Sequence, residues 1–241
     1  MPLIIDEAVS KKAVDFIRAN GKELIKKFCD EKIYIPTLNP ATYFTAGSPG
    51  AGKTEFSKSM ILELENRDPK TKIVRIDADD IRGFIPYYNG KNSLDVQAGA
   101  SLGVEKLYDY IQRKGISAFI DGTFADYDIS NRNVVRALNR KRKVGIFYIY
   151  QDPKRAWEFT KMRAALDGRY VPPEIFIEAF KKSRDNVNRV KAELDKAVEL
   201  HLVIKSYDNQ VASAYFNVSS VDSYLKEFPV IDLSSLVLKL D

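Results

Sequence analysis

The sequence predicts a doubly wound α/β fold, in which helices cover both faces of a mostly parallel sheet of about five strands. Short apolar runs alternate with longer amphipathic stretches along most of the chain, which is typical of strand–helix–strand units. A glycine-rich segment also separates the first apolar run of the core from the helix that follows it. With 241 residues, of which 45% are hydrophobic and 29% charged, the chain can bury one large core without disulfides.

The N-terminal segment predicts two helices. Between Glu7 and Lys32 the apolar residues recur at helical spacing, and Asn20-Gly21 interrupts the pattern. The residues on this apolar face are Val14, Ile17, Leu24, Ile25 and Phe28. Residues 33–40 contain two prolines and are expected to form a linker. We therefore expect residues 1–40 to be a helical extension packed on a core domain of residues 41–241.

From residue 41 onward, strands and helices alternate. Strands are expected at 42–46, 73–76, 116–120, 144–150 and 202–206. Helices are expected at 53–65, 96–113, 129–140, 153–166 and 173–200. The last strand and a further apolar run at 211–216 flank Asp208-Asn209, a turn signal that predicts a C-terminal hairpin appendage.

The net charge and its distribution indicate which kind of partner to expect. The net charge of +5 is compatible with a protein that handles phosphates or nucleotides, whereas nucleic-acid binders are usually more basic. We interpret the densest basic run, 136–143, as a solvated helix end, with polyanion binding as the alternative. Nucleic acid is therefore not the expected partner.

The remaining composition signals concern chemistry and location. Cys29 is the only cysteine and cannot form an internal disulfide, and the single histidine, His201, excludes a multi-histidine metal site. For both residues we expect a structural role. No run approaches the roughly 18 apolar residues that a membrane span needs, and the first residues lack the features of a signal peptide. We expect a cytoplasmic protein without membrane contact.

A complete phosphate-binding loop motif, G-x-x-x-x-G-K-[ST], follows the first core strand. It reads Gly47-Ser48-Pro49-Gly50-Ala51-Gly52-Lys53-Thr54. The glycines let backbone N–H groups face a polyphosphate, and the helix that begins at Lys53 adds its positive N-terminal end. Lys53 is expected to reach the β and γ phosphates, and the Thr54 hydroxyl to bind Mg²⁺. The motif predicts nucleotide binding.

The loop does not specify the reaction, because kinases, motor ATPases and GTPases all use it. Motor ATPases usually place Asp-Glu at the end of a core strand, where this chain has Asp121-Gly122. A guanine-recognition Asn-Lys-x-Asp sequence is also missing. Both observations favour a kinase.

Two carboxylates after the second strand are candidates for the acceptor side. Side chains at the C-terminal end of a parallel strand point toward the crevice where open α/β sheets bind ligands. Asp79 could accept the proton of an acceptor hydroxyl. Asp77 is a weaker candidate, and helix capping is the alternative role for both, as it is for Asp80.

Two arginines follow the fourth strand. Arg163 is placed on the next helix and Arg169 in the loop beyond it. In small P-loop kinases this region covers the phosphates, and its arginines neutralise charge on the transferring group. A solvated helix face is the alternative for Arg163, because other basic residues share the helix.

Together these residues resemble the zeta-toxin, or PezT-type, family of P-loop kinases, over about residues 43–216. The resemblance is carried by the phosphate-binding loop, by the arginine pair, and by the sequences Ile76-Asp77-Ala78-Asp79, Ile120-Asp121-Gly122-Thr123 and Asp152-Pro153-Lys154. Members of this family use ATP or GTP with Mg²⁺ to phosphorylate the 3′-hydroxyl of the N-acetylglucosamine unit of UDP-N-acetylglucosamine. This depletes a peptidoglycan precursor and poisons the cell. In such toxin systems a small, separately encoded antitoxin covers the ATP site.

The resemblance implies a role for each matching residue. Asp79 corresponds to the catalytic base, and Arg163 and Arg169 correspond to the phosphate-stabilising arginines. The implied substrate contacts are Glu105, Asp121, Thr123 and Asp77. The family usually has glutamate where this chain has Asp121. An alternative role for Asp121 is to contact Mg²⁺ through water, in addition to the expected Mg²⁺ ligand Thr54.

The departures from the family pattern lie mostly on the sugar-nucleotide side. Ala125 and Asn133 replace a family arginine and threonine, and the segment between the loop and Asp79 is longer. Other acceptors therefore stay open: a nucleoside, an antibiotic or a polynucleotide end. A nucleotide-dependent binding module is the alternative outside enzymes.

Overall fold

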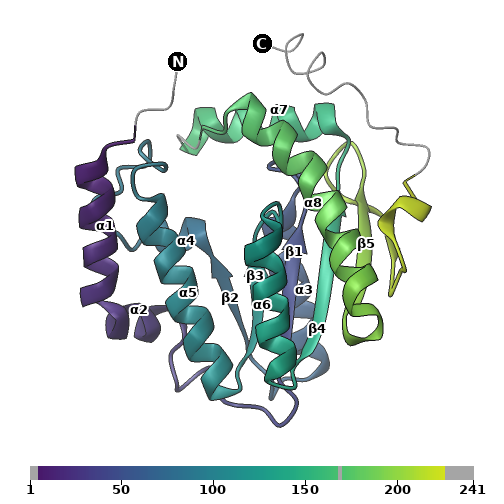
Figure 1. Cartoon of the computed structure of the whole chain (residues 1–241), viewed down its shortest axis with the longest axis horizontal. Coiled ribbons are helices and arrows are strands. Elements are labelled where there is room, and N and C mark those ends of the chain that lie inside the picture. The colour runs from purple at the N-terminus through teal and green to yellow at the C-terminus, as the bar shows by residue number, and fades with distance from the viewer. Residues whose placement is uncertain (1–4, 168–169, 226–241) are drawn as a thin grey trace.

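A computed structural model of the protein describes residues 5–167 and 170–225 (Figure 1). The helices are α1 (Glu7–Ala19), α2 (Gly21–Phe28), α3 (Lys53–Arg67), α4 (Ala78–Arg82), α5 (Gln97–Lys114), α6 (Tyr127–Asn139), α7 (Pro153–Asp167) and α8 (Pro173–Leu194). The strands are β1 (Ala41–Ala46), β2 (Ile73–Asp77), β3 (Ser117–Asp121), β4 (Lys143–Tyr150), β5 (Glu199–Lys205) and β6 (Val211–Tyr215). Short 3₁₀ turns are formed by Asp195–Ala197 and Val221–Ser223.

The strands form one six-stranded sheet in the order β2-β3-β1-β4-β5-β6. The first five strands in this order are parallel, and β6 pairs antiparallel with β5 at the edge. Thr42 of β1 lies between Ala118 of β3 and Val144 of β4, so the strand that leads into the phosphate-binding loop is central. The predicted doubly wound class is confirmed, with the hairpin joined to the sheet through β5.

Helices cover both faces of the sheet (Figure 1). On one face α3 packs through Phe56 against Phe119, Phe147 and Val203 of the strands. On the other face α5, α6 and α8 bury a larger cluster that includes Leu107, Val134 and Val187. Helix α7 crosses the end of the sheet at which the parallel strands terminate (Figure 1). This arrangement leaves the C-terminal strand ends for a site beneath α7.

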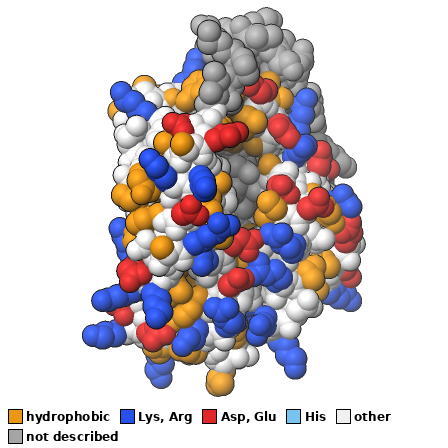
Figure 2. All heavy atoms as spheres, turned by 60° about the vertical axis from the view of Figure 1, so that its left-hand side comes forward, with side chains coloured by type: hydrophobic (Ala, Val, Ile, Leu, Met, Phe, Trp, Pro, Cys, Tyr) orange, Lys and Arg blue, Asp and Glu red, His pale blue; other side chains and the backbone are white. Residues whose placement is uncertain are grey.

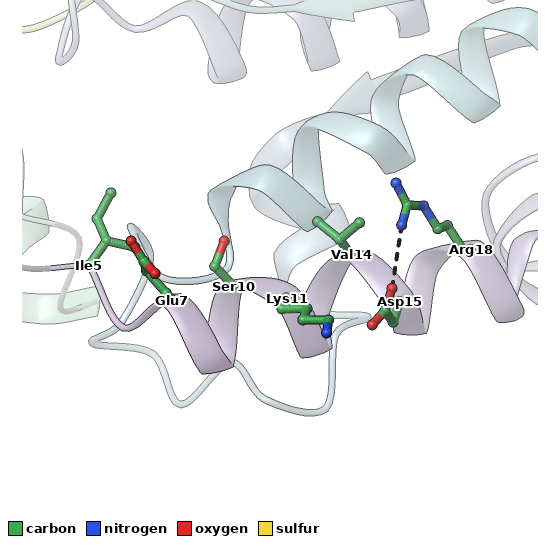
Figure 3. Close-up of a pocket in the computed structure, with 7 residues that line it drawn as sticks. All are labelled: Ile5, Glu7, Ser10, Lys11, Val14, Asp15 and Arg18. Atoms are coloured by element: carbon green, nitrogen blue, oxygen red, sulfur yellow. Dashed lines mark hydrogen bonds and ion pairs between the residues drawn. The ribbon is translucent and has the colours of Figure 1, made fainter.

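The N-terminal helices belong to the larger core cluster. Ala13, Ile17 and Leu24 are completely buried, and α1 packs closely on α5 because Gly99 has no side chain. A Cβ atom on Gly99 would lie 2.9 Å from Ala13. The opposite side of α1 lines a shallow hollow of about 400 Å³ whose side chains are mostly polar, with Asp15 and Arg18 forming an ion pair at 3.4 Å (Figure 3).

Two expected boundaries were wrong. The helix expected at 173–200 ends at Leu194, because Asp195 adopts a positive φ of 41° that stops helix propagation. Residues from Glu199 then enter β5, so His201 lies within that strand rather than before it. Short helix α4 was not anticipated as a separate element; the Asp77 side chain caps it by accepting a hydrogen bond from the Asp79 N–H at 2.9 Å.

The residues expected to be structural are packed as such. Cys29 is buried, and burial raises the pKa of its thiol to about 11. The His201 ring stacks on Phe147 with centroids 4.6 Å apart, and its Nδ1 accepts a hydrogen bond from the Asn217 N–H. Within the described ranges no helix is long and apolar enough to cross a membrane.

Candidate active site

A cavity of about 490 Å³ lies at the C-terminal ends of β1, β2 and β3. Its floor is the phosphate-binding loop, and residues of α4, α5 and α7 form its walls. This volume is within the range of sites for small ligands and cofactors. The fold thus places a cavity where open parallel sheets bind their ligands.

The loop holds its conformation through glycines and close neighbours. Gly50 and Gly52 have φ values of 72° and 82°, which residues with a Cβ atom rarely adopt. A Cβ atom on Gly50 would overlap the carbonyl oxygen of Ala156 in α7. A Cβ atom on Gly52 would lie 2.5 Å from Oδ1 of Asn209, in the turn between β5 and β6. Both α7 and the hairpin therefore pack directly on the loop.

The Lys53 side chain folds back onto the phosphate-binding loop. Its Nζ donates a hydrogen bond to the Ser48 carbonyl oxygen at 2.7 Å. Burial lowers the pKa of Lys53 to about 8, although the Asp121 carboxylate opposes this shift. An anionic phosphate that entered the cavity would compensate for the lost hydration of this ammonium group.

Asp79 and Arg163 come together across the cavity. Asp79 lies in the first turn of α4, and its Oδ2 lies 3.7 Å from an Nη of Arg163 in α7. Its Oδ1 is paired with Arg82, one turn further along α4. Both Asp79 and Arg163 line the cavity above the loop. At the opening of a phosphate-binding loop a carboxylate can accept a proton, and the arginines beside it can stabilise a transferring phosphoryl group.

Asp121 is held rigidly beneath the cavity. Its side chain is 4% exposed, and its oxygens accept hydrogen bonds from Thr45 Oγ1 at 2.9 Å, Ser57 Oγ at 3.0 Å and Arg75 at 3.0 Å. With both oxygens engaged, the carboxylate suits contact with a cation through water.

Thr54 and Asp121 fit a Mg²⁺ ion that is shared with a nucleotide. Such ions use one or two protein ligands and keep several waters or phosphate oxygens. In the part of the chain that the structure describes, no group of three or more His, Cys, Asp or Glu residues could hold a metal by itself. Thr54 and Asp121 both line the cavity, so a cation held there would depend on the phosphates.

The structure separates the other predicted site residues. Thr123 lines the cavity, and its carbonyl oxygen accepts a hydrogen bond from the Gly47 N–H at 3.0 Å. Glu105 does not line it; this residue lies further along α5 and pairs with Arg132 and Arg136 of α6. Arg169 lies outside the described residues.

Two arginines that the sequence analysis did not single out belong to this region. Arg82 bridges Asp79 and Gln97 and lines the cavity. Arg75 of β2 contacts the carboxylates of Asp77 and Asp121. Spacing could have indicated both, because residues three apart share a helix face and residues two apart share a strand face.

Comparison with known proteins finds one matching family model and several similar solved structures. The family model described as Zeta toxin matches residues 26–217. No curated protein sequence matches the chain. Among solved structures, a chain from the PezAT chromosomal toxin-antitoxin system of Streptococcus pneumoniae is similar, with a TM-score of 0.66 and 17% identity over 94% of this chain and 93% of that one.

A second group of similar structures has the same fold. A chain of the native AvrRxo1-ORF1:ORF2 complex matches with a TM-score of 0.60 and 16% identity, covering 91% of this chain and 71% of that one. A chain of the same complex with ATP matches with a TM-score of 0.61 and 14% identity over the same shares of the two chains. At these identities the similarity establishes the fold.

Proposed function

The chain belongs to the zeta toxin family, and we propose that it is a Mg²⁺-dependent kinase that uses ATP or GTP to phosphorylate a nucleotide-sugar hydroxyl. The proposed acceptor is the 3′-hydroxyl of UDP-N-acetylglucosamine. The observation that supports this most strongly is the approach of Asp79 to Arg163 directly above the phosphate-binding loop. This pairing brings a proton acceptor and a phosphate-stabilising cation from distant segments to one point.

In the proposed reaction each residue has one task. Asp79 accepts the proton of the attacking hydroxyl, and Lys53 leaves the Ser48 carbonyl to hold the β and γ phosphates. Arg163 stabilises charge on the transferring group, and Arg169 is assigned the same task from the family resemblance. Bound Mg²⁺ would supply neutralisation of the phosphate charge, next to Thr54 and Asp121.

The acceptor would enter between α4, α5 and α7. Polar groups on this side include Arg82 and Gln97, and Thr123 lies two residues beyond the end of β3. Tyr170, Val171 and Ile175 add apolar and aromatic side chains to the lining of the same cavity. Such a surface suits a ligand that combines sugar hydroxyls with a flat base. Glu105 stays a predicted substrate contact, although here it is engaged with α6.

A polynucleotide acceptor receives less support. Two of the arginines in the basic run 136–143 are already engaged within the protein. Arg136 pairs with Glu105 and Asp109, and Arg142 is buried against Thr42. On the face drawn in Figure 2, acidic side chains are interspersed among the basic ones.

We also propose that a separately encoded antitoxin protein covers the cavity. The family assignment and the similarity to a chain from a toxin-antitoxin system support this partner. Blocking the site is the simplest way for a protein inhibitor to act, because the loop and the residues of the proposed acceptor side line one cavity.

The test is an endpoint assay with purified protein, Mg²⁺, ATP and a panel of UDP-sugars, read by mass spectrometry for one added phosphate. A Lys53→Ala variant is the control and should form no product. Phosphorylated UDP-N-acetylglucosamine would support the proposal. Turnover of ATP with every UDP-sugar unchanged would contradict the acceptor, and slow hydrolysis without any phosphorylated product would favour a nucleotide-dependent binding module.

A further inference from the structure

Arg75 is a charged residue that the proposed reaction does not use. It lies on β2, on the side of the sheet that faces α3, and its side chain is only 13% exposed. Arginine is costly to bury unless carboxylates surround it, and here its guanidinium contacts Asp77, Asp80 and Asp121.

One nitrogen of Arg75 joins the ends of two strands. The same Nη lies 2.6 Å from Asp77 Oδ2 and 3.0 Å from Asp121 Oδ2. Asp77 and Asp121 are the last residues of β2 and β3 and are paired in the parallel register. Two carboxylates side by side in a poorly hydrated place repel each other unless a cation lies between them. In this structure that cation is the guanidinium.

The other oxygens of the two carboxylates reach the site. Oδ1 of Asp77 accepts the Asp79 N–H and so fixes the first turn of α4, which carries the proposed base. Oδ1 of Asp121 accepts the Thr45 hydroxyl at the end of β1, next to the loop. The contact with Asp80 is different, because the Asp80 side chain is about half exposed, at 47%, and Asp80 is not the last residue of a strand.

We propose that Arg75 is a positioning residue whose guanidinium takes the place of a second divalent cation between Asp77 and Asp121. It aligns α4 with the phosphate-binding loop and leaves the site able to take a single metal ion with the nucleotide. The kinetic part of this inference rests on the proposed function, whereas its metal-binding part does not.

The first experiment counts Mn²⁺ ions by electron paramagnetic resonance. Wild-type protein with a non-hydrolysable ATP analogue should bind about one Mn²⁺ per chain, because two-metal sites need a second cation position that Arg75 fills. A count of two would overturn the inference. This measurement uses the native chain and does not depend on the stability of any variant.

The second experiment removes the charge of Arg75. Without nucleotide, the Arg75→Gln variant should gain a Mn²⁺ site, because two unneutralised carboxylates attract a divalent cation. Its affinity for Mn²⁺ should be at least about tenfold higher than that of any site in nucleotide-free wild type. The Arg75→Gln/Asp77→Asn double variant should lose that site. A folded Arg75→Gln protein, as judged by circular dichroism, that gains no Mn²⁺ affinity would overturn the inference.

Kinetics separate positioning from a purely structural role. In Arg75→Gln kcat should fall about tenfold or more, while KM for the nucleotide stays within about threefold, because α4 is displaced and the loop is intact. Asp80→Asn is the matched control, with kcat within about twofold of wild type. If wild type phosphorylates no acceptor, the proposed function fails, and the Mn²⁺ measurements still decide the role of Arg75.

Discussion

Lys53 shows how the burial of one residue can control ligand binding. In the free protein its ammonium group has only the Ser48 carbonyl as a hydrogen-bond acceptor among the described contacts, and burial lowers its pKa to about 8. A bound polyphosphate favours the charged form and should raise that pKa. Nucleotide binding and protonation of Lys53 are therefore linked.

We predict that nucleotide affinity decreases as the pH rises through about 8. Below that pH Lys53 is already charged, whereas above it binding must take up a proton, so Kd should increase about tenfold per pH unit. The signal is the fluorescence of Trp157, the one tryptophan, which is buried in α7 beside Ala156, whose carbonyl oxygen lies against Gly50 of the loop. Lys53→Met should bind weakly with no such dependence. A constant wild-type Kd between pH 7 and 9.5 would refute the linkage.

Asp79 can be tested by a change that keeps its shape. Asp79→Asn retains the side-chain volume and loses the proton acceptor, so transfer should fall by a factor on the order of 10² to 10⁴. Nucleotide affinity should remain close to wild type, because the loop is not altered. Titration with Trp157 fluorescence and the mass-spectrometric product assay measure the two properties separately. Strong residual transfer by Asp79→Asn would exclude Asp79 as the base.

Among the elements, α7 connects the phosphate-binding loop to Arg163. Near its first turn Arg155 lies between the rings of Phe159 and Tyr207 and donates a hydrogen bond to the Tyr207 carbonyl oxygen at 2.8 Å. Its middle packs on Gly50, and Arg163 follows toward the far end. Displacement of the helix from the loop should therefore displace Arg163 as well.

Gly50→Ala tests this connection. The new methyl group would overlap the Ala156 carbonyl oxygen, and we expect nucleotide affinity to fall on the order of tenfold or more. Gly90→Ala is the matched control: Gly90 has a similar φ of 85°, and a Cβ atom there has no neighbour within 4 Å. Both variants should lose about 1–3 kcal/mol of stability from backbone strain, but only Gly50→Ala should lose binding. Equal losses of binding would disprove the connection.

The sequence could predict elements where a local signal was complete. The loop motif identified Gly47 to Thr54, and apolar periodicity identified five parallel strands and most helices. The end of α8 was missed, because Val190, Leu194, Ala197 and Val198 continue the helical spacing of apolar residues, and only the pairing of β5 with β4 shows where the strand begins. The short α4 depends on capping by Asp77, a contact too local for periodicity to reveal.

The candidate site could also be predicted only in part, namely where the sequence carries a local motif. Motif order predicted Asp79 and Arg163 as site residues, and the fold brings their side chains together at the cavity. Arg75 was missed, although its spacing places it on the same strand face as Asp77, because its contact with Asp121 depends on the pairing of β2 with β3. Glu105 matched a family position by spacing, yet its ion pairs with α6 depend on helix packing that spacing does not encode.

At the scale of the whole molecule, the N-terminal helices and the sheet share one hydrophobic core. We predict that Ile17→Ala lowers the free energy of unfolding by about 2–5 kcal/mol, since Ile17 is completely buried on the side of α1 that faces the core. Val14→Ala, on the hollow side of α1 drawn in Figure 3, should cost much less. Urea unfolding followed by circular dichroism measures both changes. Equal effects would contradict the assignment of Ile17 to the core side of α1 and of Val14 to its outer side.

The central position of β1 has a consequence for folding during synthesis on the ribosome. The strand that carries the phosphate-binding loop gains its second neighbour only when β4 has been made, and Gly52 meets Asn209 later still. At ordinary translation rates, residue 209 leaves the peptidyl-transferase centre about 10 to 40 s after the start of synthesis. A nascent chain therefore has no finished nucleotide pocket until most of its message has been read, and the ribosome itself delays the onset of activity.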